Sequence, residues 1–108
     1  MKVGFIGVGA MGVEMTRHIA AVGHQVLALD LDQAAIANAV AAGAVAARDL
    51  AEIAAGCDMA IVMVATDDQT REVVGGLLAA GVAEGFTVVV GATTHPRTMI
   101  DLAALCAL

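Results

Sequence analysis

The sequence contains no tryptophan and no tyrosine, and only two of its 108 residues are phenylalanine. Its core must therefore consist of alanine, valine, leucine, isoleucine and methionine, which suits close packing of helices on a sheet. Basic residues are also few, since five Lys and Arg stand against eleven Asp and Glu, for a formal charge of −6. This balance excludes the basic surface that binding to a nucleic-acid backbone or an anionic membrane needs.

Long hydrophobic runs are missing as well, although 60% of the residues are hydrophobic. The longest stretches without a charged or strongly polar residue, 3–13 and 73–83, have 11 residues each and contain glycines. A membrane-spanning helix needs roughly 18–20 residues, and the N-terminal stretch lacks the cleavage site of a signal peptide. The two cysteines, Cys57 and Cys106, do not have the spacing of metal ligands. We therefore expect a cytoplasmic protein without a membrane segment or a metal site.

The order of apolar segments and turn residues predicts one α/β domain in which strands and helices alternate. We expect strands at 2–6, 25–29, 44–46, 58–64 and 86–90, and helices at about 10–22, 33–42, 49–56, 67–80 and from Pro96 onward. The continuous apolar run 59–64 is typical of a parallel strand that is covered on both faces. Because the connections are short, the pattern predicts a doubly wound parallel sheet of about five strands.

Residue types predict three further details of these helices. Apolar side chains at helical spacing indicate the buried face of the first helix, namely Met11, Met15, Ile19 and Val22. Asp49 with Glu52 resembles a capping box at the start of the third helix. Asp67 and Asp68 suit the start of the fourth helix, where their charges complement its dipole.

A glycine-rich segment directly follows the first expected strand. Residues 7–12 are Gly-Val-Gly-Ala-Met-Gly, a G-x-G-x-x-G pattern. Gly7 allows a tight turn, Gly9 lets the backbone approach a pyrophosphate, and Gly12 lets the next helix pack closely on the strand. The helix then offers its N-terminal N–H groups to the anion. Because a strand precedes the motif and a helix follows it, the motif predicts dinucleotide binding by a Rossmann-type fold; a purely structural turn is the alternative.

Asp30 closes the second expected strand, 18 positions after Gly12. A carboxylate at this place can accept hydrogen bonds from the adenosine ribose hydroxyls, and it repels the additional phosphate of NADP. Leu31 follows it, where an NADP site usually supplies an arginine. The sequence therefore predicts NAD as the cofactor. The alternative is that Asp30 only ends the strand or caps the following helix.

Together, residues 4–12, Met15 and residues 23–26 resemble the opening of the β-hydroxyacid dehydrogenases, a family that includes 3-hydroxyisobutyrate dehydrogenase and, more distantly, 6-phosphogluconate dehydrogenase. Residues 43–44, 59–64 and 92–96 fall where that family has its later landmarks, so the resemblance covers essentially all 108 residues. It implies an NAD-binding domain whose complete enzyme transfers a hydride between NAD and a small β-hydroxyacid.

The resemblance also implies which residues form the site. Those that would bind the cofactor are Gly7, Gly9, Ala10, Met11, Gly12, Asp30, Leu31, Val64, Ala65, Gln69 and Thr93. Thr93 matches a threonine that contacts the nicotinamide end, and it would also lie at the substrate. Ala92 stands where the family has a substrate-binding serine, and alanine cannot make that hydrogen bond. Thr94 or the backbone would then have to supply the contact.

The general base of the family is a lysine in a C-terminal helical domain, whereas the only lysine here is Lys2. We therefore expect no catalytic residue among residues 1–108, which would form the dinucleotide-binding domain of a longer protein without the helical catalytic domain. The uncapped apolar segment 102–108 would seek a partner, so we expect a homo-oligomer. The alternative is a stand-alone nucleotide-binding or redox-sensing module without catalysis.

Overall fold

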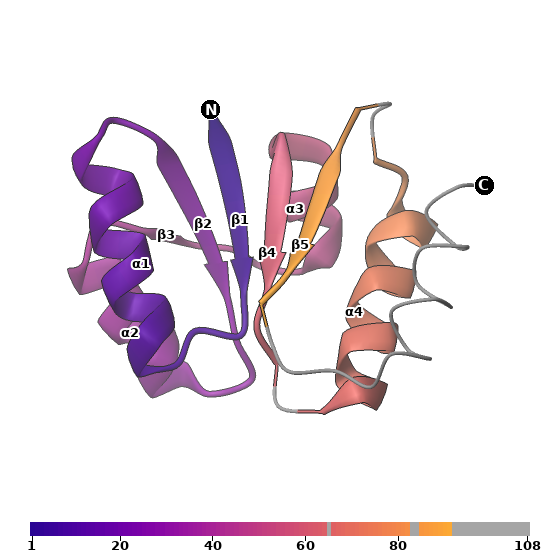
Figure 1. Ribbon diagram of the computed structural model, residues 1–108, viewed down its shortest axis with the longest axis horizontal. Coiled ribbons are helices and arrows are strands. Elements are labelled where there is room, and N and C mark those ends of the chain that lie inside the picture. Colours follow the sequence, from indigo (N-terminus) through magenta and orange to yellow (C-terminus); the bar gives the residue numbers. More distant parts are fainter. Residues whose placement is uncertain (65, 83–84, 92–108) are drawn as a thin grey trace.

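A computed structural model of the chain describes residues 1–64, 66–82 and 85–91, and in them strands and helices alternate as the sequence predicts (Figure 1). The elements are β1 (Lys2–Ile6), α1 (Ala10–Ala21), β2 (Gln25–Leu29), α2 (Gln33–Ala41), β3 (Val45–Ala46), α3 (Leu50–Gly56), β4 (Met59–Val62), α4 (Asp67–Ala80) and β5 (Thr87–Val90). Strand β4 ends at Val62, two residues earlier than expected. The helix expected from Pro96 onward lies outside the described residues.

The five strands form one parallel sheet in the order β3-β2-β1-β4-β5. The chain moves outward from β1 to β3 and then returns to the other side of β1, so β1 and β4 are neighbours. The connections after β1 and β4 therefore diverge, which opens a crevice at the carboxyl ends of these strands. In Figure 1 these ends all point toward the lower edge of the sheet. The doubly wound fold is confirmed.

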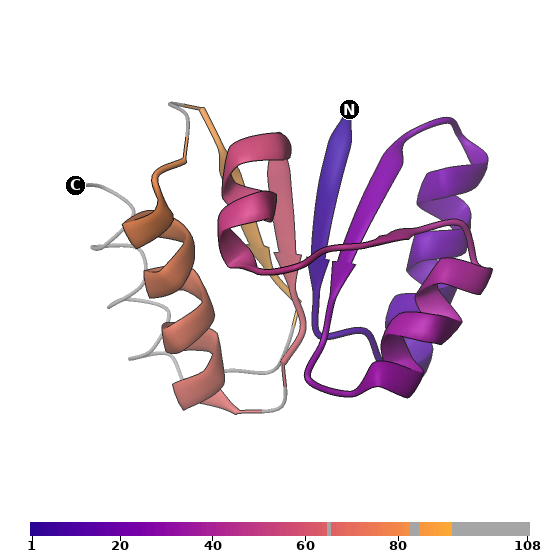
Figure 2. The same ribbon diagram turned by 180° about the vertical axis from the view of Figure 1, so that it is seen from behind.

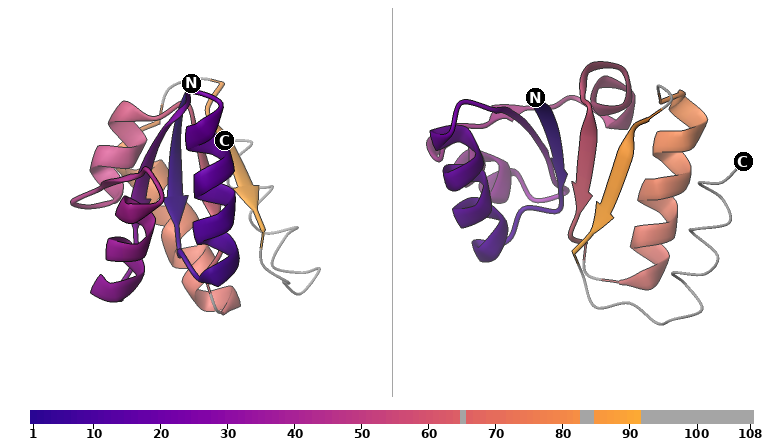
Figure 3. Two further views of the ribbon diagram at one scale, coloured as in Figure 1. Left: turned by 90° about the vertical axis from the view of Figure 1, so that its left-hand side faces the viewer. Right: turned by 45° about the horizontal axis from the view of Figure 1, so that its top comes forward.

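Helices cover both faces of the sheet, and side chains alternate between the two faces along each strand. Val3 and Phe5 of β1 belong to a buried cluster that includes side chains of α1 and α2. Ile6 belongs to a second cluster, which includes side chains of α3 and α4. Figure 2 shows α3 in front of β4, and the left view in Figure 3 shows α1 and α3 on opposite sides of the sheet.

Small residues let α3 lie close to its neighbours. A Cβ atom on Gly4 of β1 would collide with the side chain of Ile53, and one on Gly76 of α4 would lie 2.7 Å from Leu50 Cδ1. Gly4 therefore lets α3 pack closely on the sheet, and Gly76 lets it pack closely against α4, which lies beside it on the same face (Figure 2). This packing brings Leu50, the first residue of α3, to the carboxyl edge of the sheet.

The buried face of α1 differs from the predicted one. Met15 and Ile19 pack against the core, but Met11 is 68% exposed and Val22 is 73% exposed, so the prediction was wrong for these two residues. The fully buried residues among the described side chains of α1 are Gly12 and Thr16. Short side chains allow a close approach of helix and sheet, so the large apolar residues lie to one side of the contact.

The helix starts also differ in detail from the sequence prediction. Asp49 Oδ1 accepts the N–H of Glu52 at 2.9 Å, as a capping box requires. Glu52, however, accepts the N–H of Arg48 rather than that of Asp49, so only half of the expected box forms. The N-cap of α4 is Thr66, one residue before the expected pair of aspartates. Among the described helices, none is long and apolar enough to cross a bilayer.

Candidate functional site

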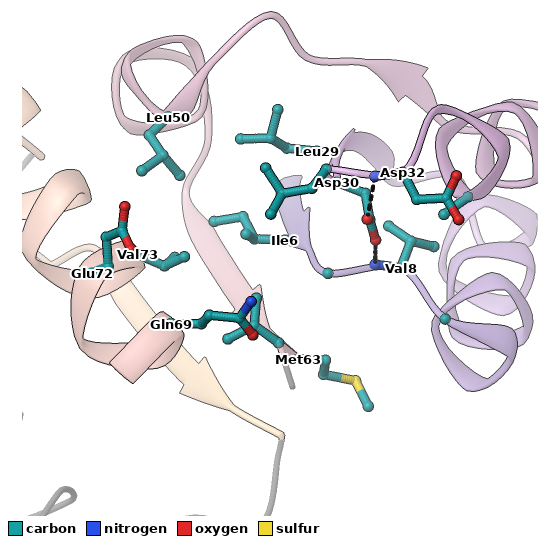
Figure 4. A pocket seen from close by; sticks show the side chains of 15 residues that line it. Ile6, Val8, Leu29, Asp30, Asp32, Leu50, Met63, Gln69, Glu72 and Val73 are labelled. Carbon is teal, nitrogen blue, oxygen red and sulfur yellow. Dashed lines mark hydrogen bonds between the residues drawn. The ribbon is translucent and has the colours of Figure 1, made fainter. Parts of the chain in front are cut away.

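A cavity of about 800 Å³ opens at the carboxyl ends of β1, β2 and β4. It lies in the crevice where the order of the strands reverses, and its size suits a small-molecule site. Figure 4 shows the side chains that line it. The lining residues are Ile6, Gly7, Val8, Gly9, Leu29, Asp30, Leu31, Asp32, Ala35, Leu50, Met63, Val64, Gln69, Glu72 and Val73.

The glycine loop begins with a turn that no other residue could adopt without strain. Gly7 has a φ of +85°, and its N–H donates to the carbonyl of Leu29 at 2.9 Å. A Cβ atom at this position would collide with the backbone carbonyl of Met63, at the end of β4. At the end of the loop, a Cβ on Gly12 would lie 3.0 Å from Phe5 Cε1. The tight turn and the close helix–strand packing that the motif predicts are thus confirmed.

The N-terminus of α1 has no side-chain cap. Its N-cap residue is Gly9, whereas side-chain oxygens of Asp32, Asp49 and Thr66 cap the other three described helices. A Cβ on Gly9 would meet no atom within 4 Å, so the space beside this residue is open. The first turn of α1 therefore presents backbone N–H groups and the positive end of the helix dipole to the cavity. This is the arrangement that binds phosphate groups at helix N-termini.

Asp30 links this loop to the end of β2. Its Oδ2 accepts the N–H of Val8 at 2.6 Å, and its Oδ1 accepts the N–H of Asp32 at 2.9 Å (Figure 4). Asp30 thus directly follows β2 and holds the glycine loop, whereas the side chain that caps the following helix, α2, is that of Asp32. Each carboxylate oxygen has a second lone pair, so both can accept one more hydrogen bond from a ligand in the cavity.

The charged side chains among the described residues that line the cavity are all acidic: Asp30, Asp32 and Glu72. No lysine or arginine is among these described lining residues. A ligand phosphate beside Asp30 would therefore meet negative charge, in contrast to a phosphate at the start of α1.

Helix α4 supplies the wall opposite α1. Thr66 and Gln69 form a capping box, in which the Gln69 N–H donates to Thr66 Oγ1 and the Thr66 N–H donates to Gln69 Oε1, both at 3.1 Å. The second of these bonds holds the Gln69 side chain at the start of α4, where it lines the cavity. Glu72 and Val73 follow on the same face of the helix, because residues three and four apart are neighbours there.

The sequence predicts part of this lining. The cavity brings together six of the predicted cofactor residues, Gly7, Gly9, Asp30, Leu31, Val64 and Gln69. Gly12 lies buried beneath the loop, and Met11 is exposed on α1 outside the lining. Ala10 is the first residue of α1. The predicted residues Ala65, Ala92, Thr93 and Thr94 lie outside the described part of the chain.

Four lining residues on helices were missed: Ala35, Leu50, Glu72 and Val73. For Glu72 and Val73 a signal existed, because they follow Gln69 by three and four positions and so share its helix face. Leu50 had no such signal. It reaches the cavity only because Gly4 and Gly76 let α3 approach, which is a contact between distant segments.

The opposite edge of the sheet holds the remaining groups of chemical interest. Lys2 is exposed at the start of β1, so the only lysine of the chain is remote from the cavity. Cys57 is buried at the end of α3. Burial, and secondarily the charge of Asp58, raises the pKa of its thiol. A buried thiol with a raised pKa is a poor nucleophile.

Comparison with known proteins agrees with this geometry. Residues 2–107 match the profile of the NAD binding domain of 6-phosphogluconate dehydrogenase. The chain is 33% identical to 2-(hydroxymethyl)glutarate dehydrogenase of Eubacterium barkeri over 99% of its own length and 36% of that protein. It is 32% identical to L-threonate dehydrogenase of Cupriavidus necator over 88% of its length and 33% of that protein.

Solved structures of dehydrogenases also resemble this chain. The structure of 3-hydroxyisobutyrate dehydrogenase from Mycobacterium tuberculosis with L-serine superimposes with a TM-score of 0.91 at 26% identity. The superposition covers 98% of the present chain and 36% of the 3-hydroxyisobutyrate dehydrogenase chain. The chain thus spans about a third of the length of the relatives that it matches. From the profile match and the cavity at the strand switch point, we conclude that the chain belongs to the NAD-binding domains of the 6-phosphogluconate and β-hydroxyacid dehydrogenase family.

Proposed function

We propose that the cavity binds NAD, with its pyrophosphate at the start of α1 and its adenosine ribose at Asp30. The observation that carries this proposal is that a helix N-terminus without a side-chain cap and a half-buried carboxylate face the same cavity. The Val8–Asp30 hydrogen bond fixes the distance between these two groups before a ligand binds. Preorganisation of this kind reduces the entropy that binding costs.

The acidic lining supports NAD over NADP. NADP has an additional phosphate on the adenosine ribose, so this phosphate would lie beside Asp30 and near Asp32. Leu31, which is 93% exposed at the cavity, offers it neither a charge nor a hydrogen bond. We therefore expect NAD and NADH to bind more tightly than NADP and NADPH.

We further propose that residues 1–108 are the cofactor-binding part of a dehydrogenase for a small β-hydroxyacid. The names of the relatives support this substrate class, and the remote position of Lys2 supports a catalytic lysine outside these residues. When bound, NAD supplies the hydride chemistry. This chain's own residues hold the pyrophosphate, orient the ribose and exclude water from the base. Residues 92–94 stay the predicted contacts to the nicotinamide end and the substrate.

Isothermal titration calorimetry and thermal unfolding with NAD⁺, NADH, NADP⁺ and NADPH test the proposal. A ligand at about 100 times its Kd adds about 2.7 kcal/mol of stability, which raises the Tm of a domain of this size by several degrees. We expect this increase with NAD⁺ and NADH, and a much smaller one with the two phosphorylated forms. The proposal fails if none of the four binds, or if NADP⁺ binds as tightly as NAD⁺.

The variant Gly9→Ala adds one methyl group and distinguishes an effect on NAD⁺ binding from an effect on folding. In Gly9→Ala the new Cβ meets no protein atom within 4 Å, so the fold is kept at the cost of a poorer N-cap, about 1 kcal/mol. The methyl group would occupy the space into which the pyrophosphate must come, so NAD⁺ binding should be lost. Gly56→Ala, at the opposite edge of the sheet, adds the same group where it also meets no atom, and it should bind NAD⁺ normally.

A further inference from the structure

Glu72 lines the cavity, but neither the pyrophosphate nor the ribose needs it. Figure 4 shows its carboxylate near Leu50 and Val73, on the side of the cavity away from Asp30. Within the described part of the chain, no hydrogen bond or ion pair holds this carboxylate. A carboxylate that is held in place only by its helix, at the wall of a cavity, can accept a hydrogen bond from a ligand.

The surroundings of Glu72 indicate which part of a ligand lies there. Ile6, Leu29, Leu50 and Val73 form an apolar region of the cavity between Asp30 and Glu72. Leu29 and Val73 come from β2 and α4, on either side of this region. Apolar side chains of this kind contact the faces of a flat ring, whereas a polar group at their margin contacts its edge. A base attached to a ribose at Asp30 would extend into this region.

We propose that Glu72 recognises the exocyclic amino group of the adenine base, so that the site selects adenine over bases with an oxo group at that position. A carboxylate is only an acceptor, and its partner must therefore be a donor. The amino group of adenine is a donor, whereas the oxo group of hypoxanthine or guanine is an acceptor that the carboxylate would repel. This inference rests on the proposed function, because it places the base of the same dinucleotide.

The test compares NAD⁺ with nicotinamide hypoxanthine dinucleotide, whose base has an oxo group in place of the amino group and a proton on the adjacent ring nitrogen. Calorimetry should give the wild-type chain about a tenfold lower Kd for NAD⁺, as expected for one charge-assisted hydrogen bond at a partly solvated site. In Glu72→Gln the amide can accept from the amino group or donate to the oxo group. The ratio of the two Kd values should therefore fall close to one. Thermal unfolding checks that the variant is folded.

Glu14→Gln is the matched control, because Glu14 is also an exposed glutamate on a helix but lies on α1, outside the cavity lining. It should keep the wild-type ratio. The inference is overturned if the wild-type chain binds both dinucleotides equally, or if Glu72→Gln keeps the wild-type ratio; NAD binding itself would stand in both cases. If neither dinucleotide binds, the proposed function fails and this inference fails with it.

Discussion

At the scale of single residues, Asp30 has a structural role and, in the proposed complex, a binding role. It accepts the N–H groups of Val8 and Asp32 and so joins the glycine loop to the turn after β2. The ligand hydroxyls would use the remaining lone pairs of the same two oxygens. The fold itself thus determines the position of the carboxylate before a ligand binds.

Replacement of Asp30 should therefore reduce both stability and binding. In Asp30→Ala two backbone N–H groups lose a charged acceptor, and we expect the free energy of unfolding to fall by about 2 kcal/mol, with NAD⁺ binding strongly weakened. Asp30→Asn keeps one acceptor oxygen and should lose about half of this stability. Urea unfolding of the three proteins measures the effect. An Asp30→Ala protein as stable as the wild type would contradict the structural role.

Cys57 should make the free energy of unfolding decrease at alkaline pH. Burial, and then the charge of Asp58, raises the pKa of its thiol, so the folded chain keeps this proton at a pH where the unfolded chain has lost it. The contribution to stability is constant below the ordinary cysteine pKa of about 8.5 and declines as the pH rises above it. Urea unfolding at increasing pH should show this decline in the wild type and a smaller one in Cys57→Ala. If the stability of the two proteins declined equally, the decline would not arise from the thiol of Cys57.

At the scale of the elements, the helix starts divide into two kinds. Three described helices begin at a residue whose side chain caps them, and α1 begins at Gly9 without such a cap. A capped start is satisfied within the protein, whereas the start of α1 keeps its N–H groups for a ligand. We therefore propose that α1 binds the ligand, whereas the three capped helices support the site.

The capping box of α4 should matter for stability as well as for the site. Thr66→Ala removes the acceptor of the Gln69 N–H and should lower the free energy of unfolding by about 1 kcal/mol. Thr66→Ser keeps the hydroxyl and should stay close to the wild type. Urea unfolding gives both values. If the alanine and serine variants were equally stable, the hydroxyl of Thr66 would not stabilise the start of α4.

Elements could be predicted from sequence much better than the contacts between them. The order of strands and helices follows from apolar runs and glycines, and the turn at Gly7 follows from the motif and its position. The exposure of Met11 and Val22 could not be predicted, because the small residues Gly12 and Thr16 decide which face of α1 approaches the sheet. The role of Leu50 depends on glycines in β1 and α4, far from it in the sequence.

At the scale of the whole molecule, the charge of −6 acts on any anionic ligand. NADP⁺ has about two more negative charges than NAD⁺, so the field of the chain repels it more strongly. Salt screens this repulsion, as the Debye length falls from about 30 Å at 0.01 M to about 8 Å at 0.15 M. The ratio of the Kd values for NADP⁺ and NAD⁺ should therefore decrease several-fold between these two salt concentrations. A ratio independent of salt would show that the discrimination does not arise from charge.

The central claim is that the cavity at the glycine loop is an NAD site, and NMR titration of the ¹⁵N-labelled chain with NAD⁺ tests it most directly. The backbone amide signals of Val8, Gly9 and Asp32 should shift in a saturable way with a single Kd, while those of Gly23 and Gly56 at the opposite edge of the sheet should stay in place. The claim would be contradicted if the amide signals of the glycine loop did not shift, or if only signals at the opposite edge of the sheet shifted.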